Sequence, residues 1–150
     1  MPYRMRFFDT SDDSLSLKDI EVALKREDPA YRLEIFEDSE RPLADMYFGD
    51  GVYAQIELNQ PGDGLFDEEI QEMLEFLIDA EANGRKQVEK VLKTAKRIIA
   101  AQVLSQGRES EETLSAIDPL WKWLFFTRKG LLHADSEGYY DEDDLILEDA

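Results

Sequence analysis

The single histidine of this 150-residue chain, His133, lies two residues before Asp135, and the pair is the feature of the sequence closest to catalytic machinery. An imidazole oriented by a carboxylate acts as a general base when a nucleophile lies beside it. No nucleophile motif accompanies the pair, and the chain contains 0 Cys. We therefore expect His133 to be a structural or surface residue, and we assign no catalytic residue.

The acidic segment 135–144 has some features of a calcium-binding loop. An EF-hand loop requires an oxygen ligand and then a glycine at the two positions where this segment has Tyr139 and Tyr140. The template therefore fails, and a solvated acidic turn is the simpler interpretation. Nonspecific binding of divalent cations by the clustered carboxylates is the alternative.

Three further carboxylates, Asp9, Asp12 and Asp13, follow the first apolar run of the chain. A cluster of this kind is found in metal-dependent phosphotransferases and nucleases, but the spacing here fits no established motif. Loop carboxylates more often cap helices or form Asx-turns. We predict no metal site and no cofactor.

The charge of the chain is strongly lopsided, with 17 Lys+Arg against 35 Asp+Glu and a net charge of -18. A nucleic-acid-binding protein needs a basic surface to neutralise phosphates, so direct nucleic-acid binding is not expected. Anionic lipid also repels such a surface, and no apolar run is long enough to span a membrane. We expect a cytoplasmic protein without membrane contact.

One segment has the opposite sign, since residues 81–108 carry more basic than acidic groups. Its apolar periodicity predicts a long helix over residues 85–105. A basic stripe is expected along the opposite side of that helix, formed by Lys86, Lys90, Lys93 and Arg97. A solvated helix face is the simpler interpretation, and a docking stripe for an acidic segment is the alternative.

Hydrophobic patterning predicts a single α+β domain over residues 1–150. The expected order is strand, helix, three strands, three helices and then a terminal strand or hairpin. Clean alternation of apolar and polar residues favours a mainly antiparallel sheet, with the helices packed on one face. Strands are expected at residues 3–7, 31–35, 43–48 and 52–58, and helices at 17–28, 67–78, 85–105 and 110–129.

Residues 135–150 form an acidic C-terminal segment, which the pattern favours as a terminal hairpin. The helix before it carries neighbouring aromatic residues that cannot all point inward. An exposed aromatic patch would mark an interface, whereas a helix buried on most sides is the alternative. The candidate partner-binding residues are Asp141, Glu142, Asp143, Asp144, Trp121, Trp123 and Phe126.

These features favour a non-enzymatic acidic protein that binds a basic protein partner, as inhibitors and immunity-type proteins do. A small carboxylate enzyme that uses a divalent cation is the alternative. The acidity is also compatible with solubility alone or with a salt-rich cytoplasm. A homodimer is a further alternative, because the outer sheet face is expected to carry Arg4, Arg6, Arg32, Tyr53 and Gln55.

Overall fold

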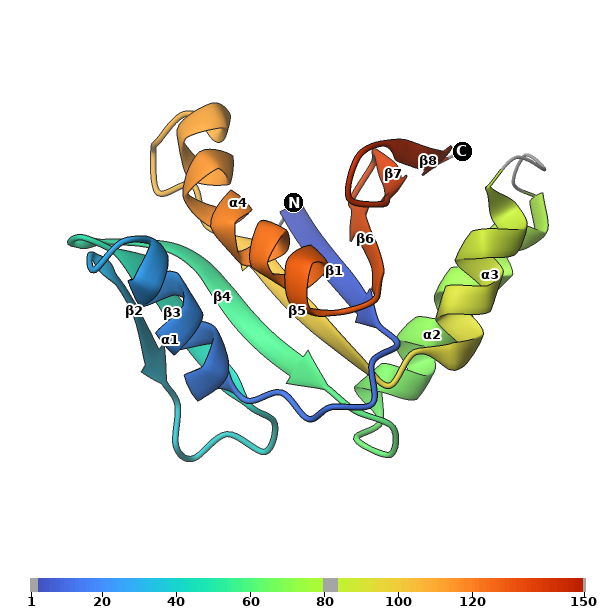
Figure 1. Cartoon of the computed structure of the whole chain (residues 1–150), viewed down its shortest axis with the longest axis horizontal. Coiled ribbons are helices and arrows are strands. Elements are labelled where there is room, and N and C mark those ends of the chain that lie inside the picture. The colour runs from blue at the N-terminus through green and yellow to red at the C-terminus, as the bar shows by residue number, and fades with distance from the viewer. Residues whose placement is uncertain (1–2, 80–83, 150) are drawn as a thin grey trace.

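The computed structural model describes residues 3–79 and 84–149, which form one antiparallel sheet and the helices on it (Figure 1). The strands are β1 (Tyr3–Asp9), β2 (Tyr31–Ile35), β3 (Leu43–Phe48), β4 (Gly51–Asn59), β5 (Arg97–Val103), β6 (Gly130–Ala134), β7 (Gly138–Tyr140) and β8 (Leu145–Glu148). The helices are α1 (Leu17–Glu27), α2 (Leu65–Phe76), α3 (Arg85–Thr94) and α4 (Ser110–Thr127), with a 3-10 turn, η1 (Leu77–Asp79).

The eight strands lie in the order β2-β3-β4-β5-β1-β6-β7-β8, and every neighbouring pair is antiparallel. The predicted α+β class and the mainly antiparallel sheet are therefore confirmed. No helix in the described ranges is long and apolar enough to cross a bilayer.

The helices cover both faces of the sheet, whereas the sequence predicted one covered face. Helices α1 and α4 pack on the face that includes Phe7, and α2 and α3 pack on the face that includes Phe8. Both phenylalanines are fully buried although they are consecutive residues of β1. A strand with consecutive buried apolar residues must be covered on both sides, so Phe7-Phe8 already carried this signal.

Strand β5 corrects the predicted long helix, because α3 ends at Thr94 and the chain continues as a strand from Arg97. β5 pairs with β1 on one side and with β4 on the other. Ile98 and Ile99 are fully buried in opposite cores. A short apolar run covered on both faces has no alternation, so its periodicity does not distinguish a strand from a helix.

Helix α1 begins with a capping box formed by Ser16 and Asp19. The Ser16 hydroxyl accepts from the Asp19 backbone N–H at 3.1 Å, and the Asp19 carboxylate accepts from the Ser16 N–H at 3.0 Å. These reciprocal bonds satisfy backbone donors that a helix N-terminus leaves without partners. The cap fixes the start of α1 over the sheet edge.

A side chain of α1 also closes that edge, which is β2. The Glu21 carboxylate is 8% exposed and accepts a hydrogen bond from the backbone N–H of Leu33 in β2 at 2.8 Å. Lys18 and Lys25 of the same helix lie beside the carboxylate. Glu21 therefore takes the place that a carbonyl of a further strand would occupy.

Replacing Glu21 by alanine is expected to lower the free energy of unfolding by about 2 kcal/mol at pH 7, because the Leu33 N–H loses a charged acceptor. The backbone bond from Leu33 holds the pKa of Glu21 below its usual 4.5. A lowered pKa means that this stabilisation is present above pH 4.5 and disappears as the pH falls through the folded-state value.

Urea unfolding at pH 7 and at pH 3 checks this expectation. The matched control is Glu27→Ala, which removes an exposed carboxylate from the last turn of the same helix. The expected deficit of the Glu21 variant is large at pH 7 and shrinks on acidification. Equal losses for the two variants at pH 7 would show that the edge contact does not stabilise the fold.

Candidate functional site

A groove of about 330 Å³ lies between α2 and the C-terminal meander formed by β6, β7 and β8. These elements stand at the right of Figure 1. We call this hollow the α2–meander groove. Apolar side chains of the groove come from α2, η1 and the meander: Met73, Phe76, Leu77, Tyr139 and Leu147. Charged or titratable side chains also line it: Arg6, Glu69, Glu72, His133, Asp135, Glu148 and Asp149.

Strand register builds one wall of the groove. Arg6 of β1 lies opposite His133 of β6, His133 lies opposite Tyr139 of β7, and Tyr139 lies opposite Leu147 of β8. Directly opposed residues point to the same side of a sheet. Four strands therefore place a cation, an imidazole, a phenol and an aliphatic side chain in one row that faces α2.

Arg6 neutralises part of the acidic lining. Its guanidinium pairs with Glu69 of α2, and its Nη1 lies 3.0 Å from Oδ1 of Asp135. The Arg6 side chain is only 13% exposed, so these pairs are shielded from water and salt. Glu69 and Asp135 are thus already compensated.

His133 is paired with Asp149 rather than with Asp135, which the sequence offered as its neighbour. Its Nε2 lies 3.1 Å from both Asp149 oxygens. An ionised carboxylate only accepts, so the imidazole donates through Nε2–H. His133 is 6% exposed, and its Nδ1 has no hydrogen-bond partner among the described residues.

Tyr139 forms the aromatic part of the groove. Its ring centroid lies 4.7 Å from that of His133. Burial raises the pKa of Tyr139, and the Asp149 charge raises it further. The phenol is therefore neutral at physiological pH and acts as an apolar surface with a polar tip.

Within residues 3–79 and 84–149, no three His, Asp or Glu side chains are arranged to hold a metal ion. The Asp9 carboxylate, expected from the sequence as part of a loop cluster, is fully buried between two arginines.

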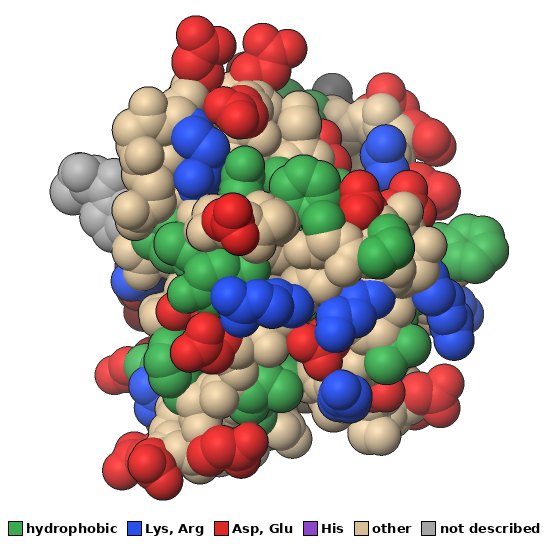
Figure 2. Space-filling view, turned by 90° about the vertical axis from the view of Figure 1, so that its left-hand side faces the viewer, with side chains coloured by type: hydrophobic (Ala, Val, Ile, Leu, Met, Phe, Trp, Pro, Cys, Tyr) green, Lys and Arg blue, Asp and Glu red, His purple; other side chains and the backbone are tan. Residues whose placement is uncertain are grey.

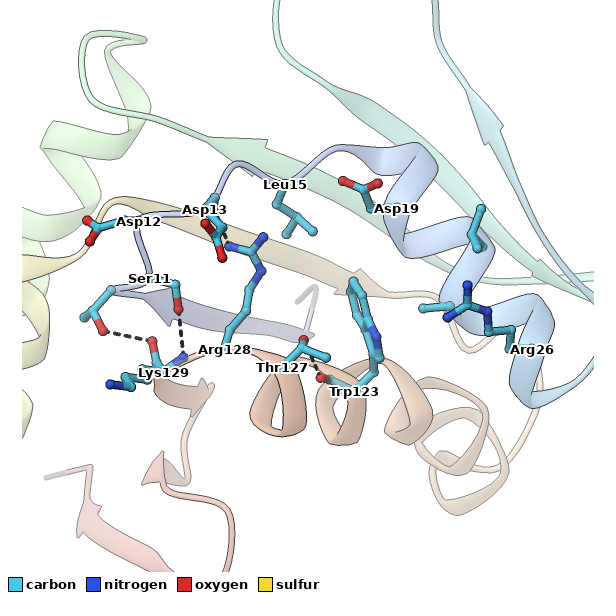
Figure 3. Close-up of a pocket in the computed structure, with 13 residues that line it drawn as sticks. Ser11, Asp12, Asp13, Leu15, Asp19, Arg26, Trp123, Thr127, Arg128 and Lys129 are labelled. Carbon is cyan, nitrogen blue, oxygen red and sulfur yellow. Dashed lines mark hydrogen bonds between the residues drawn. The ribbon is translucent and has the colours of Figure 1, made fainter.

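A second hollow, of about 750 Å³, lies between α1, the C-terminal end of α4 and the loop after β1. Figure 3 shows Arg128 reaching from the end of α4 toward this loop, with Trp123 standing beside the hollow. Arg128 donates to the backbone oxygens of Asp13 at 2.7 Å and of Ser14 at 2.6 Å. This hollow mixes cations and carboxylates, so its charge does not favour one class of ligand.

The loop beside the second hollow is anchored by Asp9. Its Oδ2 lies 2.5 Å from Nη1 of Arg97 and 2.7 Å from Nη1 of Arg128, while Oδ1 accepts from the Ser11 N–H at 2.9 Å. Asp9 thus ties the end of β1 to the start of β5 and to the end of α4. The role is structural, as the Asx-turn interpretation predicted.

The predicted aromatic patch does not form one surface. Trp121 is 4% exposed and belongs to the core, so the prediction that a partner contacts it is corrected. Trp123 is half-buried beside the second hollow, and Phe126 is 84% exposed. Side chains at these spacings leave the helix in different directions.

The predicted acidic turn does reach solvent. Glu142, Asp143 and Asp144 are exposed between β7 and β8. Asp141 is half-buried and accepts from the backbone N–H groups of Asp143 at 2.8 Å and Asp144 at 2.7 Å, which makes an Asx-turn. The turn is therefore held by its first carboxylate, while the others remain on the surface.

The predicted basic stripe is shorter than expected. Lys86, Lys90 and Lys93 are exposed on α3, where Lys93 pairs with Glu89 at 2.6 Å. Arg97 lies on β5 and binds Asp9, so it is not part of the stripe. Arg97 was wrongly assigned to the stripe because a helix was predicted where the chain forms strand β5.

Comparison with models of known protein families, with curated proteins and with solved structures found no match to this chain. The argument for function therefore rests on geometry and charge. Of the groove residues, the sequence identified His133, Asp135 and Arg6 and missed the others. The missed carboxylates come from α2 and from the end of β8 with the residue after it, which lie far apart along the chain: Glu69, Glu72, Glu148 and Asp149.

Proposed function

We propose that this protein binds a basic protein partner through the surface formed by α2 and the C-terminal meander, in a non-catalytic role such as that of an inhibitor or immunity-type protein. The observation that carries the proposal is the α2–meander groove, which joins apolar side chains to five carboxylates. Apolar contact supplies affinity, and carboxylates select cationic partners and speed their approach.

The distribution of positive charge supports this choice of surface. Several arginines are held by partners within the fold. Arg41 pairs with Glu57, and Arg97 and Arg128 pair with Asp9. Arg108 donates to Leu104 O at 2.8 Å and lies over the Tyr53 ring at 3.7 Å. From Gly130 to Ala150 the sequence has no Lys or Arg. Among the described contacts, only Arg6 and His133 pair with carboxylates of the meander, at Asp135 and Asp149. Within the described part of the chain, the remaining acidic residues of the meander are therefore uncompensated.

The opposite end of the molecule is different. Figure 2 shows a band of Lys and Arg side chains across the face at the α1 and β2 end, with Asp and Glu above and below it. The mixed charge at that end favours neither an acidic nor a basic partner. The outer-face tyrosine expected to support a homodimer, Tyr53, packs instead against the α1–α4 core and Phe48.

Two variants that lose the same number of charges test the proposal. The first neutralises carboxylates of the proposed surface: Glu72→Gln, Glu142→Gln, Asp143→Asn and Glu148→Gln. The second neutralises exposed carboxylates near the other end of the sheet: Glu27→Gln, Glu37→Gln, Asp38→Asn and Glu40→Gln. Solubility depends on total charge, whereas a recognition surface depends on position.

Immobilised protein is exposed to a lysate, and the captured proteins are identified by mass spectrometry and rebound in purified form. We expect a basic protein that binds at about 0.05 M NaCl and is lost by about 0.5 M, where exposed charges are screened. Binding of that protein should fall at least about tenfold for the first variant and little for the second. Equal loss for both variants, or capture that survives molar salt, would contradict the proposal.

A further inference from the structure

We infer that the α2–meander groove receives the side chain of one arginine presented by the basic partner. This inference rests on the proposed function and names what its central contact recognises. Three properties of the groove carry it: its size, the carboxylates that remain without a cation, and the exposed ring of Phe76.

The size of the groove suits one long side chain. A volume of about 330 Å³ is at the small end for pockets that hold ligands, which run from about 300 to 1,000 Å³. Its apolar lining includes Met73 and Leu77, which are 7% and 4% exposed, and Phe76, which is 68% exposed. An arginine stem can cover such a surface while its charged head stays at the rim.

The charge of the groove is only partly balanced. Arg6 compensates Glu69 and Asp135, and His133 donates to Asp149. Among the described residues, Glu72 and Glu148 have no basic partner within salt-bridge distance. Two carboxylates from opposite walls are therefore available to a cation, and the Nδ1 of His133 is a buried acceptor without a donor.

Aromatic surface favours arginine over lysine. Phe76 of α2 is 68% exposed, whereas the His133 and Tyr139 rings that line the opposite wall are 6% and 4% exposed, so Phe76 offers the ring face. A guanidinium is planar, weakly hydrated and able to stack on rings while it donates to several acceptors in its plane. A lysine ammonium is compact and strongly hydrated, so it gains less from the same walls.

The test uses Nα-acetyl-arginine N-methylamide as the probe and the full-length protein. His133 is the only histidine in the chain, so its ring signals in an NMR spectrum report on the groove alone. The matched probe is the citrulline analogue, in which a neutral urea replaces the guanidinium. The corresponding lysine derivative is the third probe.

We expect the arginine probe to shift the His133 ring signals saturably in the millimolar range, at least about tenfold more tightly than the citrulline probe and more tightly than lysine. The double variant Glu72→Gln, Glu148→Gln should weaken the arginine probe about tenfold. The control Glu37→Gln, Asp38→Asn neutralises two exposed carboxylates at the other end of the sheet and should leave binding unchanged.

The inference is overturned if no saturable shift occurs, if citrulline binds as well as arginine, or if lysine binds more tightly. Its failure is distinct from failure of the proposed function. Salt-sensitive capture of a basic protein that depends on the first four-carboxylate variant, without any arginine effect at His133, would leave the proposed function standing and reject the arginine contact. An arginine effect without any such protein would reject the proposed function, and with it the partner as the source of the arginine, while the groove would remain an arginine site.

Discussion

Replacing Asp9 by alanine is expected to lower the free energy of unfolding by about 3–5 kcal/mol, because the change leaves two buried guanidinium groups without their shared counter-ion. Asp9 is fully buried, and the Arg97 and Arg128 side chains around it are 11% and 9% exposed. Neither cation can recover full hydration while the fold is intact. The loop after β1 also loses its anchor on Ser11.

Urea unfolding at neutral pH and thermal melting measure this loss, and the melting temperature should fall by on the order of 10 °C for a domain of this length. Asp12→Ala is the matched control, since Asp12 is an exposed carboxylate of the same loop. Its effect should stay within about 0.5 kcal/mol. A loss below about 1 kcal/mol for the Asp9 variant would show that its two arginines find other acceptors.

Replacing Gly138 by alanine is expected to cost about 3 kcal/mol or more and to distort the α2–meander groove. Gly138 has φ +137, where a side chain is strained, and an added Cβ would lie 2.1 Å from the backbone oxygen of Leu147. Backbone atoms cannot move aside as a flexible side chain can. Gly138 lies opposite Glu148, so β7 and β8 would have to separate.

The control for this variant is Gly107→Ala, at φ +82 with no atom within 4 Å of the added Cβ. It carries only the conformational cost of about 1 kcal/mol. The unfolding free energies of the two variants therefore separate steric conflict from backbone strain. We also expect shifted His133 ring signals for the Gly138 variant without any ligand, and unchanged signals would contradict the predicted separation of β7 and β8.

Most elements of the fold follow from local patterns. Alternation in the segments of β1 to β4 and the Ser16–Asp19 cap predict their elements directly, and the structure confirms them. The pattern fails where a strand is covered on both faces, as in β5, because Ile98 and Ile99 both have to be apolar. For the same reason, the sequence pattern did not predict that helices cover the second face of the sheet.

The residues of the groove are harder to predict from the sequence than the helices and strands, because the groove depends on the order of the strands. Arg6, His133 and Leu147 come together only because β1, β6, β7 and β8 are neighbours in one register. Nothing local distinguishes Asp149 from Asp135 as the partner of His133, since both are acids near a strand end. A single sequence shows which residues are present, but it does not show that the residues of such a row are neighbours in the sheet.

Acidification has two separate effects on this chain. It removes the repulsion between molecules, and at lower pH it removes the Glu21 charge that closes the sheet edge at β2. Near pH 4.3 the chain has no net charge, so repulsion between molecules vanishes and they can come together. The pKa of Glu21 lies below its usual 4.5, chiefly because its carboxylate accepts the Leu33 N–H, so Glu21 loses its charge at a lower pH than a glutamate without this bond would. A second molecule that adds a strand to β2 must first displace this carboxylate, so the contact protects the edge from strand-upon-strand association while Glu21 keeps its charge.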